Sequence, residues 1–305
     1  HTVNNSGTFN FYNGRLRDTK SKADGAAVYN TGTFNMYGGT ITGNTATAGN
    51  GGGIYIHFNA GSVSISNATI TGNKASATGN TSYGHGGGIY SQRGVTVKNV
   101  TITGNNSTYE GGGIYGKGAI TLTDATVTDN NRYDVYYGGV EGTTSNSKLT
   151  VSGSVKAGYY ANFDWKMPIL VSGALSEDSV IRVGVREGIK PNAGGSLLIA
   201  EPASGVTLSA ENFKADAADS VTSLGKDGKV YLSLGVNELG YYDDQGFYDS
   251  YCKAIDDIRR IQPHAVIYIQ NLIPLNEEVI AQTTKRTYLT NEHLRVYNDL
   301  IKKAA

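Results

Sequence analysis

The sequence lacks several features that would point directly to a function. It contains a single cysteine, Cys252, which excludes an internal disulfide, and no Cys-x-x-Cys motif or Cys/His cluster indicates a zinc site. No apolar stretch approaches the roughly 20 residues that a membrane-spanning helix requires. The 26 basic and 26 acidic residues cancel to a net charge of zero. Neither a nucleic acid nor an anionic membrane surface is therefore an expected partner.

Glycine is abundant, but one end of the chain has none. Of the 41 glycines in 305 residues, 30 lie in residues 1–158, and none occurs from Phe247 onward. This uneven distribution predicts two different kinds of structure in one chain.

The glycine-rich part repeats three short motifs, each with the alternation of a β-strand. One motif, of the type Thr-Ile-Thr-Gly-Asn, occupies residues 39–44, 68–73, 100–105 and 125–130. A second, of the type Gly-Gly-Ile-Tyr, occupies residues 26–29, 52–55, 87–90 and 112–115. A third precedes the first, at residues 32–36, 61–65, 94–97 and 118–122. Fixed strands joined by corners of variable length are typical of a solenoid.

Such units bury an apolar face only by stacking, and parallel coils stack about 4.8 Å apart. The alternation predicts inward side chains at Ile41, Ile70, Ile102 and Val127, with their flanking threonines outward. Glycine triplets at 51–53, 86–88 and 111–113 allow sharp corners. Asparagine ends the first motif in every repeat. We expect these side chains to stack as an amide ladder at one corner, formed by Asn44, Asn73, Asn105 and Asn130.

This pattern resembles the right-handed parallel β-helix, the pectin-lyase-like solenoid, of large bacterial surface and secreted proteins. The resemblance covers about residues 7–158 and implies an extracellular or bacterial cell-surface location. We expect domains at 1–158 (parallel β-helix), 159–234 (a β-rich cap) and 235–305 (a small α/β segment). Further strands are expected around 168–171, 180–183 and 229–232, a later strand at 265–270, and helices at about 247–262 and 291–302.

The C-terminal segment resembles the SGNH, or GDSL, hydrolase family, whose fold is flavodoxin-like. Gly235-Val236-Asn237-Glu238 is similar to the family's Gly-x-Asn-Asp block, and residues 258–275, Asn291 and Tyr297-Asn298 extend the resemblance. It implies that Asn237 is an oxyanion-hole donor. No Gly-Asp-Ser nucleophile block and no Asp-x-x-His block occur, so the resemblance implies an incomplete and inactive hydrolase. The alternative is a serine esterase or carbohydrate acetylesterase whose serine and histidine blocks are missing from this chain.

The coils themselves lack clustered carboxylates. Polysaccharide-cleaving β-helix enzymes need such clusters to hold calcium or to supply an acid and a base. Between residues 25 and 123 the only acidic residue is Glu110. Asp124 and Asp129 are expected to be separate corner aspartates, and His57 and His85 are expected to be solvent-exposed loop residues. We therefore expect no catalytic site in the coils, no metal and no cofactor.

Two regular surfaces remain as candidates for binding. The repeat predicts a column of aromatic rings at Tyr29, Tyr55, Tyr90 and Tyr115. Such a column is able to stack on sugar rings, which makes these residues glycan-binding candidates, and it also stabilises stacked strands without any ligand.

The second surface is a grid of paired threonines at 40/42, 69/71, 101/103 and 126/128, which is interrupted at 15–17 and 154–156. It resembles the ice-binding faces of some β-solenoids, although β-branched residues also suit any solvated sheet face. The sequence as a whole predicts a secreted or cell-surface protein, adhesin-like or glycan-contacting, with a carbohydrate or host-cell ligand.

Overall fold

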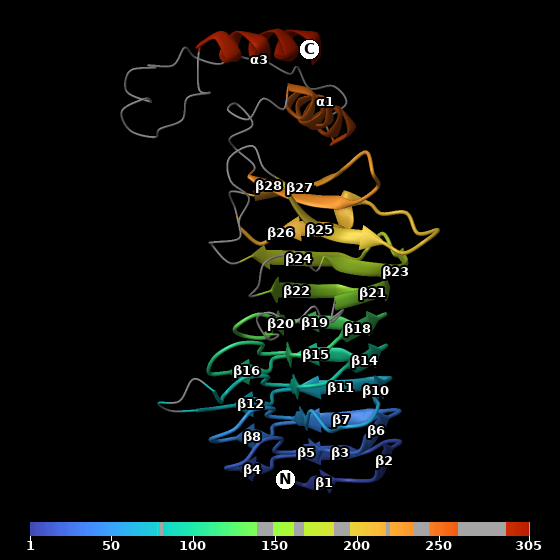
Figure 1. The fold of residues 1–305 in the computed structure, drawn as a ribbon, viewed down its shortest axis with the longest axis vertical. Coiled ribbons are helices and arrows are strands. Elements are labelled where there is room, and N and C mark those ends of the chain that lie inside the picture. Colours follow the sequence, from blue (N-terminus) through green and yellow to red (C-terminus); the bar gives the residue numbers. More distant parts are fainter. Residues whose placement is uncertain are drawn as a thin grey trace. The chain divides into compact units, whose positions relative to one another are not determined.

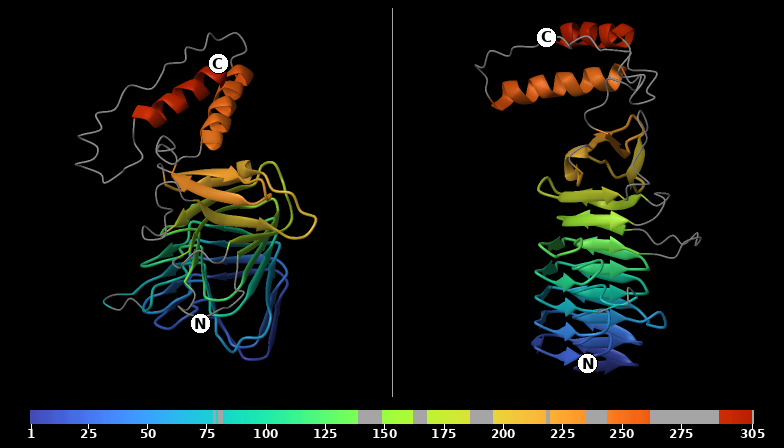
Figure 2. Two further views of the ribbon diagram at one scale, coloured as in Figure 1. Left: turned by 45° about the horizontal axis from the view of Figure 1, so that its top comes forward. Right: turned by 90° about the vertical axis from the view of Figure 1, so that its left-hand side faces the viewer.

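A computed structural model describes residues 1–77, 79, 82–138, 149–161, 168–185, 196–217, 220–234, 244–261 and 291–304. The chain divides into two compact units. The first comprises residues 1–190, 198–217 and 222–231, and the second comprises residues 191–197, 218–221 and 232–305. Figures 1 and 2 show the first unit as a stack of coils that begins at the N-terminus.

Each of the first four coils contributes one strand at each of four positions. The tyrosine strands are β1 (Val3–Asn5), β5 (Val28–Asn30), β9 (Ile54–Ile56), β13 (Ile89–Ser91), β17 (Ile114–Gly116) and β20 (Val135–Tyr137). Next along each coil come β2 (Thr8–Phe11), β6 (Thr33–Met36), β10 (Val63–Ser66), β14 (Val95–Lys98), β18 (Ile120–Thr123) and β21 (Leu149–Gly153). The threonine strands are β3 (Arg15–Arg17), β7 (Gly39–Thr42), β11 (Ala68–Thr71), β15 (Thr101–Thr103) and β19 (Thr126–Thr128). The fourth position holds β4 (Lys20–Ser21), β8 (Thr45–Ala46), β12 (Lys74–Ala75) and β16 (Asn106–Ser107).

Equivalent strands pair in parallel from coil to coil, which confirms the predicted solenoid. The tyrosine and threonine strands share one sheet, called sheet 1, while β2, β6, β10, β14, β18 and β21 belong to sheet 2. The register aligns Ile41 with Ile70, Ile70 with Ile102 and Ile102 with Val127. All four side chains have no exposed surface, so the predicted inward column is confirmed as part of the core.

The fourth strand of each coil was not predicted. β4, β8, β12 and β16 are two residues long and form a small sheet of their own, called sheet 3. Their first residue varies, and their second is serine or alanine in every coil. Two residues are too few to show the alternation of a strand. Glycine corners follow them, as predicted: Gly111 has φ of +67°, and a side chain there would collide with the Ile114 carbonyl.

The coil changes shape at β22 (Lys156–Ala161). This single strand pairs with β19 through Lys156 and Ala157, and with β20 through Tyr159 to Ala161. The corner that separates those two strands in the preceding coil is therefore drawn out straight at Gly158. Figure 1 shows this transition from separate short strands to one continuous strand.

Parallel pairing continues beyond the sequence repeats. β24 (Val180–Val185) pairs with β22, and β26 (Phe213–Ala215), which follows the 3₁₀ turn η2 (Ala210–Asn212), pairs with β24. In sheet 2, β23 (Ile169–Leu175) and β25 (Leu197–Pro202) follow β21, and β28 (Val230–Leu234) and β27 (Ser220–Leu224) end the order. Strands are thus confirmed in all three regions predicted after Gly158.

The second unit contains two described helices, α1 (Asp244–Ile261) and α3 (Asn291–Ala304), close to the predicted ranges. Tyr297 and Ile301 of α3 are buried, and Tyr251 of α1 packs against them. Lys303 Nζ lies 4.9 Å from the centre of the Tyr248 ring. The strand predicted at 265–270 lies outside the described residues, and the resemblance to SGNH hydrolases gains no support from the two helices alone. Neither described helix is long and apolar enough to cross a membrane.

Candidate functional site

The predicted tyrosine column exists, and it is longer than the repeat indicated. Tyr29, Tyr55, Tyr90 and Tyr115 stack in register, and Tyr136 and Tyr160 continue the column. Neighbouring ring centroids are 5.1 to 5.5 Å apart, and neighbouring planes differ by 3° to 15°. Tyr136 and Tyr160 escaped the sequence alignment because their flanking residues no longer match the Gly-Gly-Ile-Tyr motif.

The rings are largely covered, although they point away from the solenoid interior. Tyr55 alternates with the inward Ile54 and Ile56, yet it is only 6% exposed, and Tyr90 is 4% exposed. Each inner ring has a neighbouring tyrosine on both faces. Burial raises the pKa of the Tyr115 hydroxyl to about 12, and the nearby Glu110 carboxylate adds to the rise. The flat faces that would stack on sugars are therefore occupied within the column.

Other side chains contact the tyrosine column at its two ends and along the edge formed by its hydroxyl groups. The His1 ring lies 5.0 Å from Tyr29, and Tyr133 stacks on Tyr160 at 4.2 Å. Along the edge, Tyr55 donates its hydroxyl hydrogen to Gln92 Oε1 over 3.1 Å. The same oxygen accepts the Phe58 backbone N–H over 3.1 Å.

A second column, of mixed residue types, lines the glycine corner beside the tyrosines. We call Asp24, Asn50, His85 and Glu110 the corner column. In each step a backbone N–H donates to the side chain of the coil before it: Asn50 to Asp24 Oδ1 at 2.7 Å, His85 to Asn50 Oδ1 at 3.0 Å and Glu110 to His85 Nδ1 at 3.2 Å. No repeated residue type marks this column, so sequence reasoning missed it.

His85 and His57 are half-buried, which corrects the prediction that both are solvent-exposed loop residues. The Nδ1 atom of His85 accepts the Glu110 backbone N–H, so in this arrangement that nitrogen carries no hydrogen. Its ring centre also lies 4.6 Å from that of Tyr115. The His57 ring lies 4.0 Å from Phe58 at the edge of the tyrosine column.

Glu110 ends the corner column with an unusual carboxylate. Its Oε2 atom is buried and has no hydrogen-bond partner among the described residues. Burial raises the pKa of Glu110, and the positive charge of Arg132 offsets part of that rise. In return, the Glu110 charge helps to raise the pKa of Tyr115 and Tyr136. Glu110, the one acidic residue between residues 25 and 123, thus lies against the tyrosine column.

The predicted asparagine ladder is confirmed. Nδ2 of each asparagine donates to Oδ1 of the next, from Asn44 to Asn73 at 2.9 Å, Asn73 to Asn105 at 2.9 Å and Asn105 to Asn130 at 3.0 Å. Each Nδ2 also donates to backbone carbonyls, and each inner asparagine is buried. The ladder satisfies the turn backbone at this corner, as the repeat predicted.

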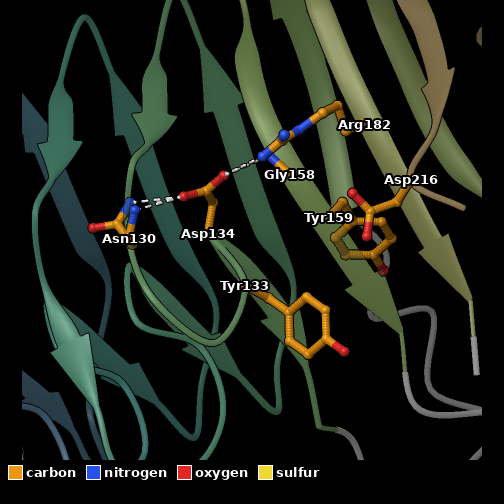
Figure 3. A pocket seen from close by; sticks show the side chains of 7 residues that line it. All are labelled: Asn130, Tyr133, Asp134, Gly158, Tyr159, Arg182 and Asp216. Atoms are coloured by element: carbon orange, nitrogen blue, oxygen red, sulfur yellow. Dashed lines mark hydrogen bonds and ion pairs between the residues drawn. The ribbon is translucent and has the colours of Figure 1, made fainter.

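Asp134 terminates the ladder and lines a cavity of about 190 Å³ (Figure 3). Its Oδ1 accepts the N–H and Nδ2 of Asn130 at 3.0 and 3.1 Å, and its Oδ2 accepts the Gly158 N–H at 3.1 Å. Arg182 Nη2 lies 3.7 Å from Oδ2. Burial raises the pKa of Asp134, while these bonds lower it. Both oxygens are already engaged, so the carboxylate caps the ladder where the coil straightens.

Asp124 and Asp129 form separate corners, as predicted. Both are exposed and adopt positive φ, of 49° and 58°. Asp124 Oδ1 accepts the Ser154 N–H at 3.0 Å, whereas Asp129 Oδ2 accepts the Thr128 hydroxyl at 3.1 Å. Across the part of the chain that the structure describes, no cluster of three His, Cys, Asp or Glu side chains is arranged to hold a metal.

The threonine pairs form an aligned grid on β7, β11, β15 and β19. Thr40 pairs with Thr69, Thr69 with Thr101 and Thr101 with Thr126, and the second threonines align in the same way. At one end of the grid Arg15 and Arg17 lie beside its first threonine pair, and at the other end Lys156 lies beside Thr126. The grid and its charged limits are therefore present as the sequence predicted.

Asn237, the predicted oxyanion-hole residue, lies outside the described residues. The same is true of residues 262–290, which carry most of the resemblance to SGNH hydrolases.

One family model matches part of the chain. A model of the Chlamydia polymorphic membrane protein repeat matches residues 99–117. These residues run from the threonine strand β15, through the asparagine and glycine corners, into the tyrosine strand β17. The chain is a parallel β-helix repeat protein. No curated protein and no solved structure matches it.

Proposed function

We propose that this protein is a surface-exposed, autotransporter-like β-helix protein whose solenoid acts as an adhesin-like stalk for a carbohydrate or host-cell ligand. The observation that carries the proposal is the family match at 99–117, because that segment contains the motifs that recur in the other coils. The fully paired solenoid also suits a stalk, since each coil is held by its neighbours and the stack presents long regular faces.

Adhesion is tested directly with beads coated with the purified chain and added to cultured epithelial cells. We expect binding above that of albumin-coated beads, and a reduction after mild periodate treatment of the cells, which oxidises sugar diols. Binding equal to the albumin control would refute the adhesin role. Binding that survives periodate would exclude a glycan ligand but retain a host-cell ligand.

For Tyr29, Tyr55, Tyr90 and Tyr115, we propose that any glycan contact uses the hydroxyl edge. This follows from the stacking of the rings, which occupies the inner faces. Tyr55→Phe/Tyr90→Phe removes two hydroxyls and keeps the stack. A glycan array that gives equal signals for this variant and the wild type would remove the column from the binding surface.

Ice binding through the threonine grid is a second candidate, and the coil-to-coil register of the threonines favours it. In dilute solution an ice binder shapes crystals into facets. Thr71→Lys/Thr103→Lys would place charge in the middle of the grid and abolish the facets. Round discs with the wild-type protein would end this candidate.

We propose no ester hydrolase activity for residues 235–305 in this chain, because the family's serine and histidine blocks have no counterpart in the sequence. Hydrolysis of an activated acetyl ester, lost on Asn237→Ala, would contradict this proposal. Unchanged background hydrolysis in wild type and variant is the expected result.

A further inference from the structure

The outer face of sheet 2 carries a pair of stacked tyrosines, separate from the column on sheet 1, and both rings are exposed. Tyr12 and Tyr37 follow β2 and β6, their ring centroids are 5.0 Å apart, and their planes differ by 18°. Tyr12 is 70% exposed and Tyr37 is 46% exposed. By contrast, the four inner rings of the column on sheet 1 are buried, and the two end rings, Tyr29 and Tyr160, are half-buried. The exposed pair therefore offers the free aromatic surface that the column lacks.

An amide pair lies beside these rings on the same face. Asn10 and Asn35 are aligned in the register of β2 and β6, two residues before Tyr12 and Tyr37. Asn35 Nδ2 donates to Asn10 Oδ1 over 2.9 Å. This bond uses one amide hydrogen of Asn35 and the oxygen of Asn10, so the Asn10 amide hydrogens and the Asn35 oxygen remain for a ligand.

Hydroxyl groups extend this surface along the later coils. The register places Ser64, Thr96, Thr121 and Thr150 in line with Asn35, and it aligns Ser66, Lys98, Thr123 and Ser152 in the neighbouring rank. These side chains are exposed or half-buried. We call the two ranks, together with Asn10, Asn35, Tyr12 and Tyr37, the sheet 2 face. Lys98 is its one charged member.

We propose that the sheet 2 face binds a neutral oligosaccharide, with one sugar ring against Tyr12 and Tyr37 and the following sugars along the hydroxyl ranks. The inference rests on the proposed function and deepens it, because it names the ligand class and the face. Sugars combine an apolar ring face with many hydroxyls, and the sheet 2 face pairs aromatic rings with amide and hydroxyl groups.

The composition of this face disfavours other ligands. A nucleic acid or an anionic glycan needs several cations, and the face has only Lys98. A protein interface needs an apolar core with anchor residues, whereas the ranks beyond the tyrosines are hydroxyls apart from Lys98. The two ranks themselves hold no carboxylate, so they supply no acid and base pair to cleave a sugar that lies along them.

The test is calorimetric titration of the full chain with three hexasaccharides: β-1,4-linked glucose, β-1,4-linked N-acetylglucosamine, and galacturonate as the charged probe. We expect binding of at least one neutral probe and a roughly tenfold or greater loss of its affinity in Tyr12→Ala/Tyr37→Ala. Ile258→Ala is the control, because Ile258 is 43% exposed and lies on helix α1, outside both the sheet 2 face and the tyrosine column. This control should bind as the wild type does.

Three results would overturn the inference. The first is no binding of either neutral probe at millimolar concentration. The second is equal affinity of the wild type and the double variant, and the third is tighter binding of the galacturonate probe. Circular dichroism that matches the wild type shows that the exposed substitutions leave the fold intact.

Failure of this inference is distinguishable from failure of the adhesin proposal. If beads coated with Tyr12→Ala/Tyr37→Ala bind cells as wild-type beads do, and no neutral probe binds, the sheet 2 face is not the binding surface and the adhesin proposal stands. If neutral probes bind in a Tyr12- and Tyr37-dependent manner while beads do not bind cells, the face is a glycan site and the host-cell role is refuted.

Discussion

Replacement of Asn105 by alanine tests whether the asparagine ladder holds the solenoid together. Asn105 is 1% exposed and lies in the middle of the ladder. Its Nδ2 donates to the carbonyls of Ile70 and Thr103 at 2.9 and 3.1 Å and to Asn130 Oδ1 at 3.0 Å. Its Oδ1 accepts the backbone N–H and the Nδ2 of Asn73 at 3.0 and 2.9 Å.

The magnitude follows from which groups lose their partners. The buried N–H of Asn73 would lose its acceptor, which costs about 1–3 kcal/mol, and each remaining bond contributes about 1 kcal/mol. Since Asn73 Nδ2 keeps the carbonyls of Ile41 and Thr71 as acceptors, part of the loss is recovered. We expect Asn105→Ala to lower the free energy of unfolding by about 2–5 kcal/mol.

The assay is urea denaturation followed by circular dichroism, with Asn106→Ala as the matched control. Asn106 is the adjacent residue, of the same type, and it is exposed, so its truncation should change stability by less than about 0.5 kcal/mol. A loss below about 1 kcal/mol for Asn105→Ala, or equal losses for the two variants, would refute the reasoning.

Three further predictions use the same assay. Tyr90→Ala should lower stability by about 3–5 kcal/mol and Tyr90→Phe by much less, because the ring lies between two others; equal losses would contradict a stacking role. Burial raises the pKa of Glu110 in the folded state, so the contribution of this group to stability is most favourable below its unfolded-state pKa and is lost as pH rises through its folded-state pKa. Glu110→Gln should therefore be more stable than the wild type at pH 7 but not at pH 4. A stability difference that does not change with pH would oppose this. Gly111→Ala should cost more than about 2 kcal/mol because of its positive φ and the Ile114 carbonyl, whereas Gly7→Ala, with open space around it, should be near neutral.

The parts of the structure that were predicted are those in which one residue type returns at one position of each coil. The inward isoleucines, the asparagine ladder and the threonine grid all satisfy this condition, because each coil presents the same local environment to its neighbour. Stacking of equivalent residues then follows from the repeat itself.

The corner column could not be predicted in this way. Asp24, Asn50, His85 and Glu110 share a role, which is to accept a backbone N–H from the next coil, and several residue types supply such an acceptor. Asp134 was missed for a similar reason, since it replaces an asparagine oxygen at the point where the coil straightens. Only the backbone path shows that these residues lie in line.

The tyrosine column and the Tyr12–Tyr37 pair show that the exposure of a ring could not be predicted from the sequence. The sequence predicted a column at Tyr55 and Tyr90 as a candidate sugar-binding surface, but the covered rings leave mainly an edge there. Tyr12 and Tyr37 do not stand out in the sequence, because tyrosine does not recur at this position in later coils, and yet their rings are exposed.

The sequence by itself determined the solenoid, its coil-to-coil register and the identity of its core, because periodic burial requires periodic residues. The tertiary structure decided which aromatic rings remain accessible and where the asparagine ladder ends. Exposure depends on what neighbouring corners cover, and the corners are the parts whose length and residue types vary from coil to coil.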